Sequence, residues 1–296
     1  MSRGAPSAVR HTRTAGSFLA YPSIAVLLVW MIVPLAMTLW FSFRTYLLLD
    51  PTRRGWAGWD NYYYLVTDPD FWVSIGNTLV MLVAVLAITV IFGVLLAVLF
   101  NERFPGRNVA RVLAISPFFV MPTVSALVWK NMMLHPVYGV LGALARAVGL
   151  NAPDLFAEHP LAAIVAILSW EWLPYALLVL LTAVQSLDGE QKEAARVDGA
   201  GPIAQFWYLT LPHLGRAIGV VIMVETIFLL TVFAEIFVTT NGGPGNASTN
   251  LAYLIFRAAL QDFDAGTASA GGMVAVLLAN IVAFLLVRTA ARGMDA

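Results

Sequence analysis

Six stretches of this chain are apolar and long enough to cross the hydrocarbon core of a bilayer, which takes about 20 helical residues. The stretches cover residues 18–43, 71–100, 109–133, 161–184, 217–240 and 267–290. Only 11% of the residues are charged, whereas a soluble domain carries about 25%. A soluble core cannot hide this much apolar surface. The sequence therefore predicts an all-α integral membrane protein with six transmembrane helices, in one domain at residues 17–292 that follows a polar tail at residues 1–16.

The distribution of Lys and Arg predicts how these helices are oriented. An even number of spans puts both termini on one side of the membrane. Of the 17 Lys and Arg residues, eleven would lie on that side and six on the other. Both termini and the loop at residues 186–215 are therefore expected in the cytoplasm. The opposite loops are rich in aromatic residues typical of a membrane interface, namely Trp56, Trp59, Tyr62, Tyr63, Tyr64 and Trp72.

Several kinds of chemistry have no residues to support them. The chain has no cysteine, and its four histidines are too far apart in sequence to show a metal-ligand spacing. Lys130 and Lys192 are the only lysines and neither follows a glycine-rich loop, so the chain lacks a Walker A motif. The net charge is zero, which predicts no nucleic-acid partner. The sequence thus predicts no catalytic activity, no resident cofactor and no metal.

The most specific motif lies in the loop between the fourth and fifth apolar stretches. It contains Glu193-Ala194-Ala195, then Asp198-Gly199-Ala200, and then Leu209-Thr210-Leu211-Pro212. Asp188 and Gln191 predict a capping box at the start of a helix, and Gly199 suits the left-handed position that ends one. Pro202 is expected to open a second helix, and Pro212 to stop it. The predicted loop is therefore a helix, a tight glycine turn and a second helix.

The spacing of this motif resembles the EAA coupling loop of permease subunits in binding-protein-dependent type I ABC importers. Other stretches are similar to the sugar-importing branch of that family: Asn61-Tyr62, Phe71-Trp72, Asn77-Thr78, Pro117, Pro122, Trp129 and the glycine-rich loop at residues 240–249. Residues 225–240 look most like mannitol/sorbitol permeases. The resemblance implies the type I ABC importer permease fold and a subunit that carries a sugar alcohol or related carbohydrate across the bacterial inner membrane. A disaccharide or another sugar derivative is the alternative within the family.

The resemblance also implies partners. A second, related permease would complete the pore as a heterodimer within the lipid. Two copies of an ABC ATPase would bind ATP and Mg, and a solute-binding protein would deliver the substrate from outside. The residues matched to the ATPase contact are Glu193, Ala194, Ala195, Asp198, Gly199, Ala200, Leu209, Leu211 and Pro212.

Carboxylates inside apolar stretches are costly and are therefore candidates for function. This chain has three of them, Glu171, Glu225 and Glu235. In sugar importers of the resembled family, the substrate contacts the helices that flank the coupling loop. The candidates for the substrate pathway are accordingly Glu171, Trp172, Tyr175, Glu225, Phe228 and Leu229.

Structural roles compete at each carboxylate, and two other protein classes compete with the importer. Glu225 could pair with a basic residue of the second permease, Glu235 could be hydrated near the outer surface, and Glu171 could satisfy a tryptophan N–H or a broken helix near Pro174. An ion-coupled secondary transporter would show more spans or paired inverted repeats. A membrane enzyme would need a catalytic cluster, and the sequence shows none.

Overall fold

The computed structural model describes the backbone of residues 8–50 and 52–294, and these residues are mostly helical. Four long helices match predicted spans: α1 (Ala8–Ser42), α3 (Pro69–Asn101), α8 (Pro160–Gln185) and α14 (Ala265–Met294). A fifth, α11 (Leu211–Leu229), continues from shorter elements beginning at Pro202. The described residues thus include five helices long and apolar enough to cross a membrane, or six if one bent pair is counted as a span.

The predicted third span is not a straight helix. Residues 109–133 are divided among α4 (Arg107–Ile115), η1 (Ser116–Phe119), α5 (Pro122–Val128) and η2 (Trp129–Met133), and the two halves meet at 107°. Pro122 explains the break, because the residue before a proline is pushed out of the helical region. Met121 is accordingly extended, with ψ of 138°. The apolar segment predicted at these residues is therefore present as a bent pair of helical pieces, and its crossing of the membrane as one span stays a prediction.

The predicted fifth span is also interrupted. Helix α11 ends at Leu229, and a separate short helix, α12 (Ala234–Thr239), follows. No glycine or proline lies in the break, so its sequence gives no warning. The freed backbone is bound from elsewhere, because Asn250 Nδ2 donates to the carbonyl oxygen of Val232 at 2.7 Å. Tertiary contacts therefore stabilise a break between α11 and α12 that the local helix propensity does not predict.

The ends of the first and last spans also differ from expectation. Helix α1 begins at Ala8, so residues 8–16 of the predicted tail are helical, while residues 1–7 lie outside the described part. Helix α14 runs on to Met294. Polar residues such as Arg10 and Thr12 can continue a helix that an apolar segment has already nucleated, because each added residue gains a hydrogen bond.

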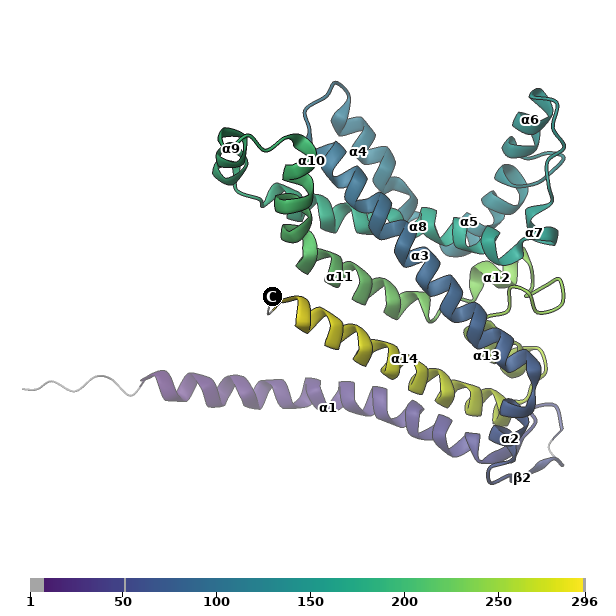
Figure 1. Ribbon diagram of the computed structural model, residues 1–296. Helices are drawn as coiled ribbons and strands as arrows, with labels where there is room; N and C mark the ends of the chain where they lie inside the picture. The colour runs from purple at the N-terminus through teal and green to yellow at the C-terminus, as the bar shows by residue number, and fades with distance from the viewer. Residues whose placement is uncertain (1–7, 51, 295–296) are drawn as a thin grey trace, which may run out of the picture.

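The bundle is built around the close pairing of α3 with α8, while α1 packs on α14 (Figure 1). Small residues allow α3 to approach α8. A Cβ atom placed on Gly93 would lie 3.0 Å from Cβ of Ala176 and 3.1 Å from Cδ1 of Leu180. Ala97 and Ala176 are fully buried in the same contact. Small residues are the usual means by which membrane helices pack closely, since lipid provides no hydrophobic drive for association.

Short elements gather at one end of the bundle. They are the hairpin of β1 (Arg44–Tyr46) and β2 (Arg54–Trp56), then α2 (Asp60–Thr67), α6 (Val140–Ala147), α7 (Leu155–Glu158), α12 and α13 (Leu251–Leu260) (Figure 1). Trp56, Trp59 and Trp72 are exposed there, as expected for a membrane interface.

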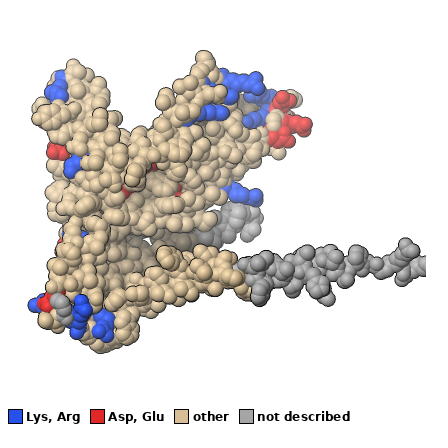
Figure 2. Space-filling model, turned by 180° about the vertical axis from the view of Figure 1, so that it is seen from behind, with Lys and Arg blue, Asp and Glu red and all other residues tan. Residues whose placement is uncertain are grey.

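The opposite end holds α9 (Gly189–Val197), α10 (Pro202–Gln205), the α3–α4 turn, the first turn of α1 and the last turn of α14 (Figure 1). The described ends of α1 and α14 thus lie at the same end of the bundle as the 186–215 loop, and the side of the membrane that this end faces stays a prediction. Figure 2 shows Lys, Arg, Asp and Glu collected toward the two ends, with a nearly uncharged band between them. That band is the part of the surface suited to hydrocarbon.

Candidate functional site: the α9–α10 loop and an aromatic cluster

The loop between α8 and α11 forms two short helices joined by a glycine turn. Asp188 caps α9, since its Oδ1 accepts a hydrogen bond from the backbone N–H of Glu190 at 3.0 Å. Gly199 has φ of +84°, and the following N–H of Ala200 donates to the carbonyl of Ala195 at 2.9 Å. Pro202 then opens α10. The predicted helix, glycine turn and second helix are therefore present.

The second helix does not end where the sequence predicted. A π-turn, η3 (Phe206–Thr210), follows α10 and leads directly into α11, with Pro212 inside the first turn of α11. A proline is tolerated there because the first N–H groups of a helix have no acceptor within it. Pro212 is thus a helix-starting residue, and the loop connects rigidly to a membrane-spanning helix.

The loop exposes both charge and apolar surface. Of the matched residues, Glu193, Ala194, Asp198, Gly199 and Pro212 are exposed, and Ala195, Ala200, Leu209 and Leu211 are half-buried. Figure 2 shows a group of acidic side chains at this corner. Large apolar side chains are exposed beside them: Val197 (87%), Ile203 (76%), Trp207 (57%) and Tyr208 (85%). Exposed apolar surface next to acidic residues is typical of a protein contact.

Three of the predicted pathway residues lie together in an aromatic cluster. The rings of Trp172 and Phe228 are 5.1 Å apart, and those of Trp172 and Tyr175 are 6.1 Å apart. The structure adds Phe118, which stacks on Tyr175 and meets Trp172 edge-on, each at 6.1 Å. Phe118 lies in η1, so its approach depends on the break in the third span. Sequence reasoning missed Phe118, for which the neighbouring Pro117 was the one available signal.

Phe228 and Phe118 are 53% and 41% exposed, so the aromatic cluster of Phe118, Trp172, Tyr175 and Phe228 reaches the surface of this chain. Leu229 does not belong to it. That side chain is fully buried among Met81, Ile164 and Ile236. The structure therefore does not bring Leu229 together with the other predicted pathway residues, and its part in the pathway stays a prediction.

The three carboxylates lie inside the bundle. Glu225 is fully buried and Thr89 Oγ1 donates to its Oε2 at 2.6 Å. Glu171 and Glu235 are 7% and 4% exposed, so Glu235 is not the hydrated surface group considered above. Oε1 of Glu171 and Oε1 of Glu225 are buried without a hydrogen-bond partner among the described residues. Within that part of the chain, no lysine or arginine forms a salt bridge with any of them.

The glycine-rich loop at residues 240–250 is held against α3. Asn77 Nδ2 contacts the carbonyl oxygens of Asn246, Ala247 and Thr249 at 2.9–3.3 Å, and Thr78 Oγ1 accepts the N–H of Leu251 at 2.9 Å. The chain turns here as predicted. Asn77 binds loop backbone, so it does not form the helix-to-helix hydrogen bond that its place in a span suggests.

Comparison with known proteins agrees with this architecture. Residues 89–296 match the family described as binding-protein-dependent transport system inner membrane component. The chain is 30% identical to a probable ABC transporter permease protein of Sinorhizobium fredii, covering 98% of this chain and 96% of that one. It is 31% identical to the trehalose/maltose transport system permease protein MalF of Thermococcus litoralis, covering 86% of each.

A solved structure has the same fold. The match is to a chain of a bacterial ABC transporter involved in the import of the acidic polysaccharide alginate, with a TM-score of 0.80 and 23% identity. It covers 96% of this chain and 97% of that one. The broken third and fifth spans are therefore features of a chain that superimposes on a type I importer permease over nearly its whole length.

Proposed function

This chain belongs to the family of inner membrane components of binding-protein-dependent transport systems, and we propose that it is the permease subunit through which an ABC importer moves a neutral carbohydrate. The observation that carries the proposal is the α9–α10 loop, with its glycine turn, its exposed acidic and apolar side chains and its continuous connection to α11. The family is one of transport components, so the chain moves its substrate without converting it.

The proposed coupling runs from the loop into the bundle. Two copies of an ATPase, one below this chain and one below a second permease, bind ATP and Mg. Glu193 and Val197 of α9 contact the ATPase, and motion of the pair is transmitted through η3 to α11. Because α11 carries both Glu225 and Phe228, a shift of the loop moves residues of the proposed substrate pathway. ATP and substrate then bias one bistable helix bundle.

The aromatic cluster supports a carbohydrate as the substrate. Trp172, Tyr175, Phe118 and Phe228 offer flat apolar faces that stack on the C–H faces of a sugar, and Phe228 and Phe118 are accessible from outside this chain. The second permease faces them across the pore. Glu171 and Glu225 belong to the same two helices, α8 and α11, and each has one buried carboxylate oxygen without a hydrogen-bond partner among the described residues. A substrate hydroxyl reaches these oxygens only when the bundle opens.

Two neutral substrates compete. A sugar alcohol such as mannitol or sorbitol is suggested by the sequence of residues 225–240, and a disaccharide is suggested by the trehalose/maltose permease among the relatives. A phosphorylated or anionic substrate is disfavoured, because the aromatic cluster lies beside carboxylates and the described residues place no arginine in it.

The orientation follows from the same proposal. The α9–α10 end faces the cytoplasm, where the ATPase is, and the end with α2, α6 and α13 faces the solute-binding protein. Both termini are then cytoplasmic, as the excess of Lys and Arg predicts.

The test is ATPase activity of the complex reconstituted in liposomes, with its binding protein and mannitol, sorbitol, maltose or sn-glycerol 3-phosphate. Stimulation by one neutral carbohydrate, lost in Glu193→Lys but kept in Glu102→Lys, an exposed carboxylate of the α3–α4 turn outside the loop, supports both parts. If maltose alone stimulates the ATPase activity, the substrate is a disaccharide and the proposal of a sugar alcohol is wrong. Uptake driven by a proton or sodium gradient without an ATPase partner would overturn the proposal.

A further inference from the structure

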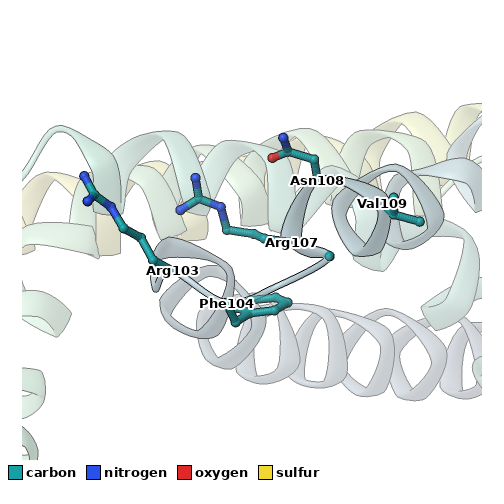
Figure 3. A pocket seen from close by; sticks show the side chains of 6 residues that line it. Arg103, Phe104, Arg107, Asn108 and Val109 are labelled. Carbon is teal, nitrogen blue, oxygen red and sulfur yellow. The ribbon is translucent and has the colours of Figure 1, made fainter.

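A pocket of about 310 Å³ lies at the turn between α3 and α4, outside the aromatic cluster. It is lined by Arg103, Phe104, Gly106, Arg107, Asn108 and Val109. Figure 3 shows the guanidinium groups of Arg103 and Arg107 and the carboxamide of Asn108 extending to the same side of the turn, with the Phe104 ring on the other. The pocket thus has a polar, positively charged rim above an aromatic side chain.

Within the part of the chain that the structure describes, no carboxylate forms a salt bridge with the arginines of this pocket. Among the described residues the salt bridge is between Arg53 and Asp50, at the other end of the molecule. Arg107 makes only long contacts, from Nη1 to the carbonyls of Asn101 and Glu102 at 3.4 and 3.3 Å. For Arg103 the described residues provide no hydrogen-bond acceptor. Glu102 is the one carboxylate in the turn, and it is exposed.

Basic residues at the opposite end are engaged by contrast. Arg146 donates to the carbonyls of Pro136 and Val137 at 2.9 and 2.8 Å. Arg257 donates to the side chain of Asn246 at 3.0 Å. Arg196 and Arg216, at the same end as the turn, also have no hydrogen-bond acceptor among the described residues, but they do not line the pocket. What distinguishes the α3–α4 turn is that two guanidinium groups line one pocket.

The backbone adds donors to the same place. Gly106 precedes α4 with φ of +81° and provides no side-chain cap. The first N–H groups of a helix have no acceptor inside it and carry the positive end of the helix dipole. Together with two arginines, which bind phosphate oxygens through paired N–H groups, they form a recognition site for a phosphate group.

The surroundings indicate what carries that phosphate. Val109, Val112 and Leu113 on α4 are 65–67% exposed, and Leu99 at the end of α3 is 53% exposed. These apolar side chains continue from the pocket toward the uncharged band of the bundle. A ligand with a phosphate group and an adjoining acyl chain would place the phosphate against the arginines and the acyl chain against the exposed apolar side chains. We propose that the α3–α4 turn binds the phosphate headgroup of an anionic phospholipid.

The experiment is native mass spectrometry of the purified complex in detergent, after incubation with phosphatidylglycerol or with phosphatidylcholine. Wild type is expected to retain phosphatidylglycerol in preference to phosphatidylcholine. Arg103→Gln should weaken retention about tenfold and the double variant Arg103→Gln/Arg107→Gln roughly 100-fold, at the low end of the net contribution of a hydrogen bond to a charged group. Arg216→Gln, an exposed arginine on α11 outside the pocket, is the matched control and should retain lipid as wild type does.

Equal retention of phosphatidylglycerol by wild type and Arg103→Gln would overturn the proposal. So would binding of inorganic phosphate, measured by calorimetry, without selective retention of the lipid, because the source would then be a free anion. If the double variant fails to assemble, Arg103→Gln still decides the matter, since Arg103 contributes no contact to the described fold. The readout needs neither transport nor ATP hydrolysis, so it is independent of the proposed substrate.

Discussion

Gly199 is the position at which a single methyl group tests the coupling loop. Its φ of +84° lies in the left-handed region, and a Cβ atom placed there would meet nothing within 4 Å. Within this chain, Gly199→Ala therefore acts through backbone conformation, without steric clash. The left-handed conformation costs a residue with a Cβ about 1–2 kcal/mol, which reduces the population of the observed turn by a factor of roughly 5–30.

The expected order of coupling is wild type, then Gly199→Asn, then Gly199→Ala, then Gly199→Val. Asparagine tolerates the left-handed region better than other residues, and a β-branched side chain tolerates it least. The measurement is the carbohydrate uptake per ATP hydrolysed by reconstituted complex, normalised to the amount of ATPase that co-purifies. Binding of the external solute-binding protein should not change, because Gly199 lies at the opposite end of the bundle.

Gly215 provides the matched control. A Cβ atom placed on it would also meet nothing within 4 Å, but Gly215 lies in α11 with an ordinary helical conformation. Gly215→Ala should leave coupling unchanged and stabilise the helix by up to about 1 kcal/mol. The reasoning is refuted if Gly199→Val couples as well as wild type, or if Gly215→Ala is as harmful as Gly199→Ala.

Three further predictions address the bundle. Gly93→Val should lower the thermal unfolding midpoint of the purified complex strongly, since a Cβ there would lie 3.0 Å from that of Ala176; an unchanged midpoint would contradict the α3–α8 packing. Thr89→Val should lower the free energy of unfolding by about 1–3 kcal/mol, because buried Glu225 loses its hydrogen-bond donor. Thr89→Ser keeps a hydroxyl donor and should not, and chemical denaturation of the two variants measures the difference. Trp172→Ala should lower carbohydrate-stimulated ATPase activity about tenfold through lost stacking, while exposed Trp30→Ala in α1 should not; equal effects would refute a role in the pathway.

The sequence predicts the glycine turn in the α9–α10 loop, but it does not predict the close packing of α3 against α8. The role of Gly199 can be predicted from the sequence, because a glycine after a run of helix-forming residues is typical of a helix end, where it adopts the left-handed conformation without strain. The role of Gly93 cannot be predicted in this way, because a glycine inside an apolar segment has the same sequence context whether it faces lipid or another helix. Only the packed bundle assigns it to the contact with Ala176.

The residues of the candidate pathway were also predicted only in part. Trp172, Tyr175 and Phe228 were predicted and do meet, but Leu229, one residue beyond Phe228, is buried in the core. Adjacent helical residues point about 100° apart, so helical position decides which of two apolar neighbours reaches the surface. Phe118 joins the cluster because the third span breaks, and a count along the sequence cannot measure the angle of a break.

Composition and local patterns in the sequence were enough to predict a chain with several membrane-spanning apolar segments and a helix-turn-helix loop before the segment at residues 217–240. These properties depend on composition and on local conformation, which neighbouring residues set. The tertiary structure decided where the third and fifth segments break, that Pro212 begins a helix, and that Glu235 is buried. The break after Leu229 and the burial of Glu235 depend on distant segments, as Asn250 shows by binding the carbonyl that the break at Val232 leaves free. Pro122 and Pro212 act locally, but a proline can either end or begin a helix, and the packed structure decided which of the two occurs at each.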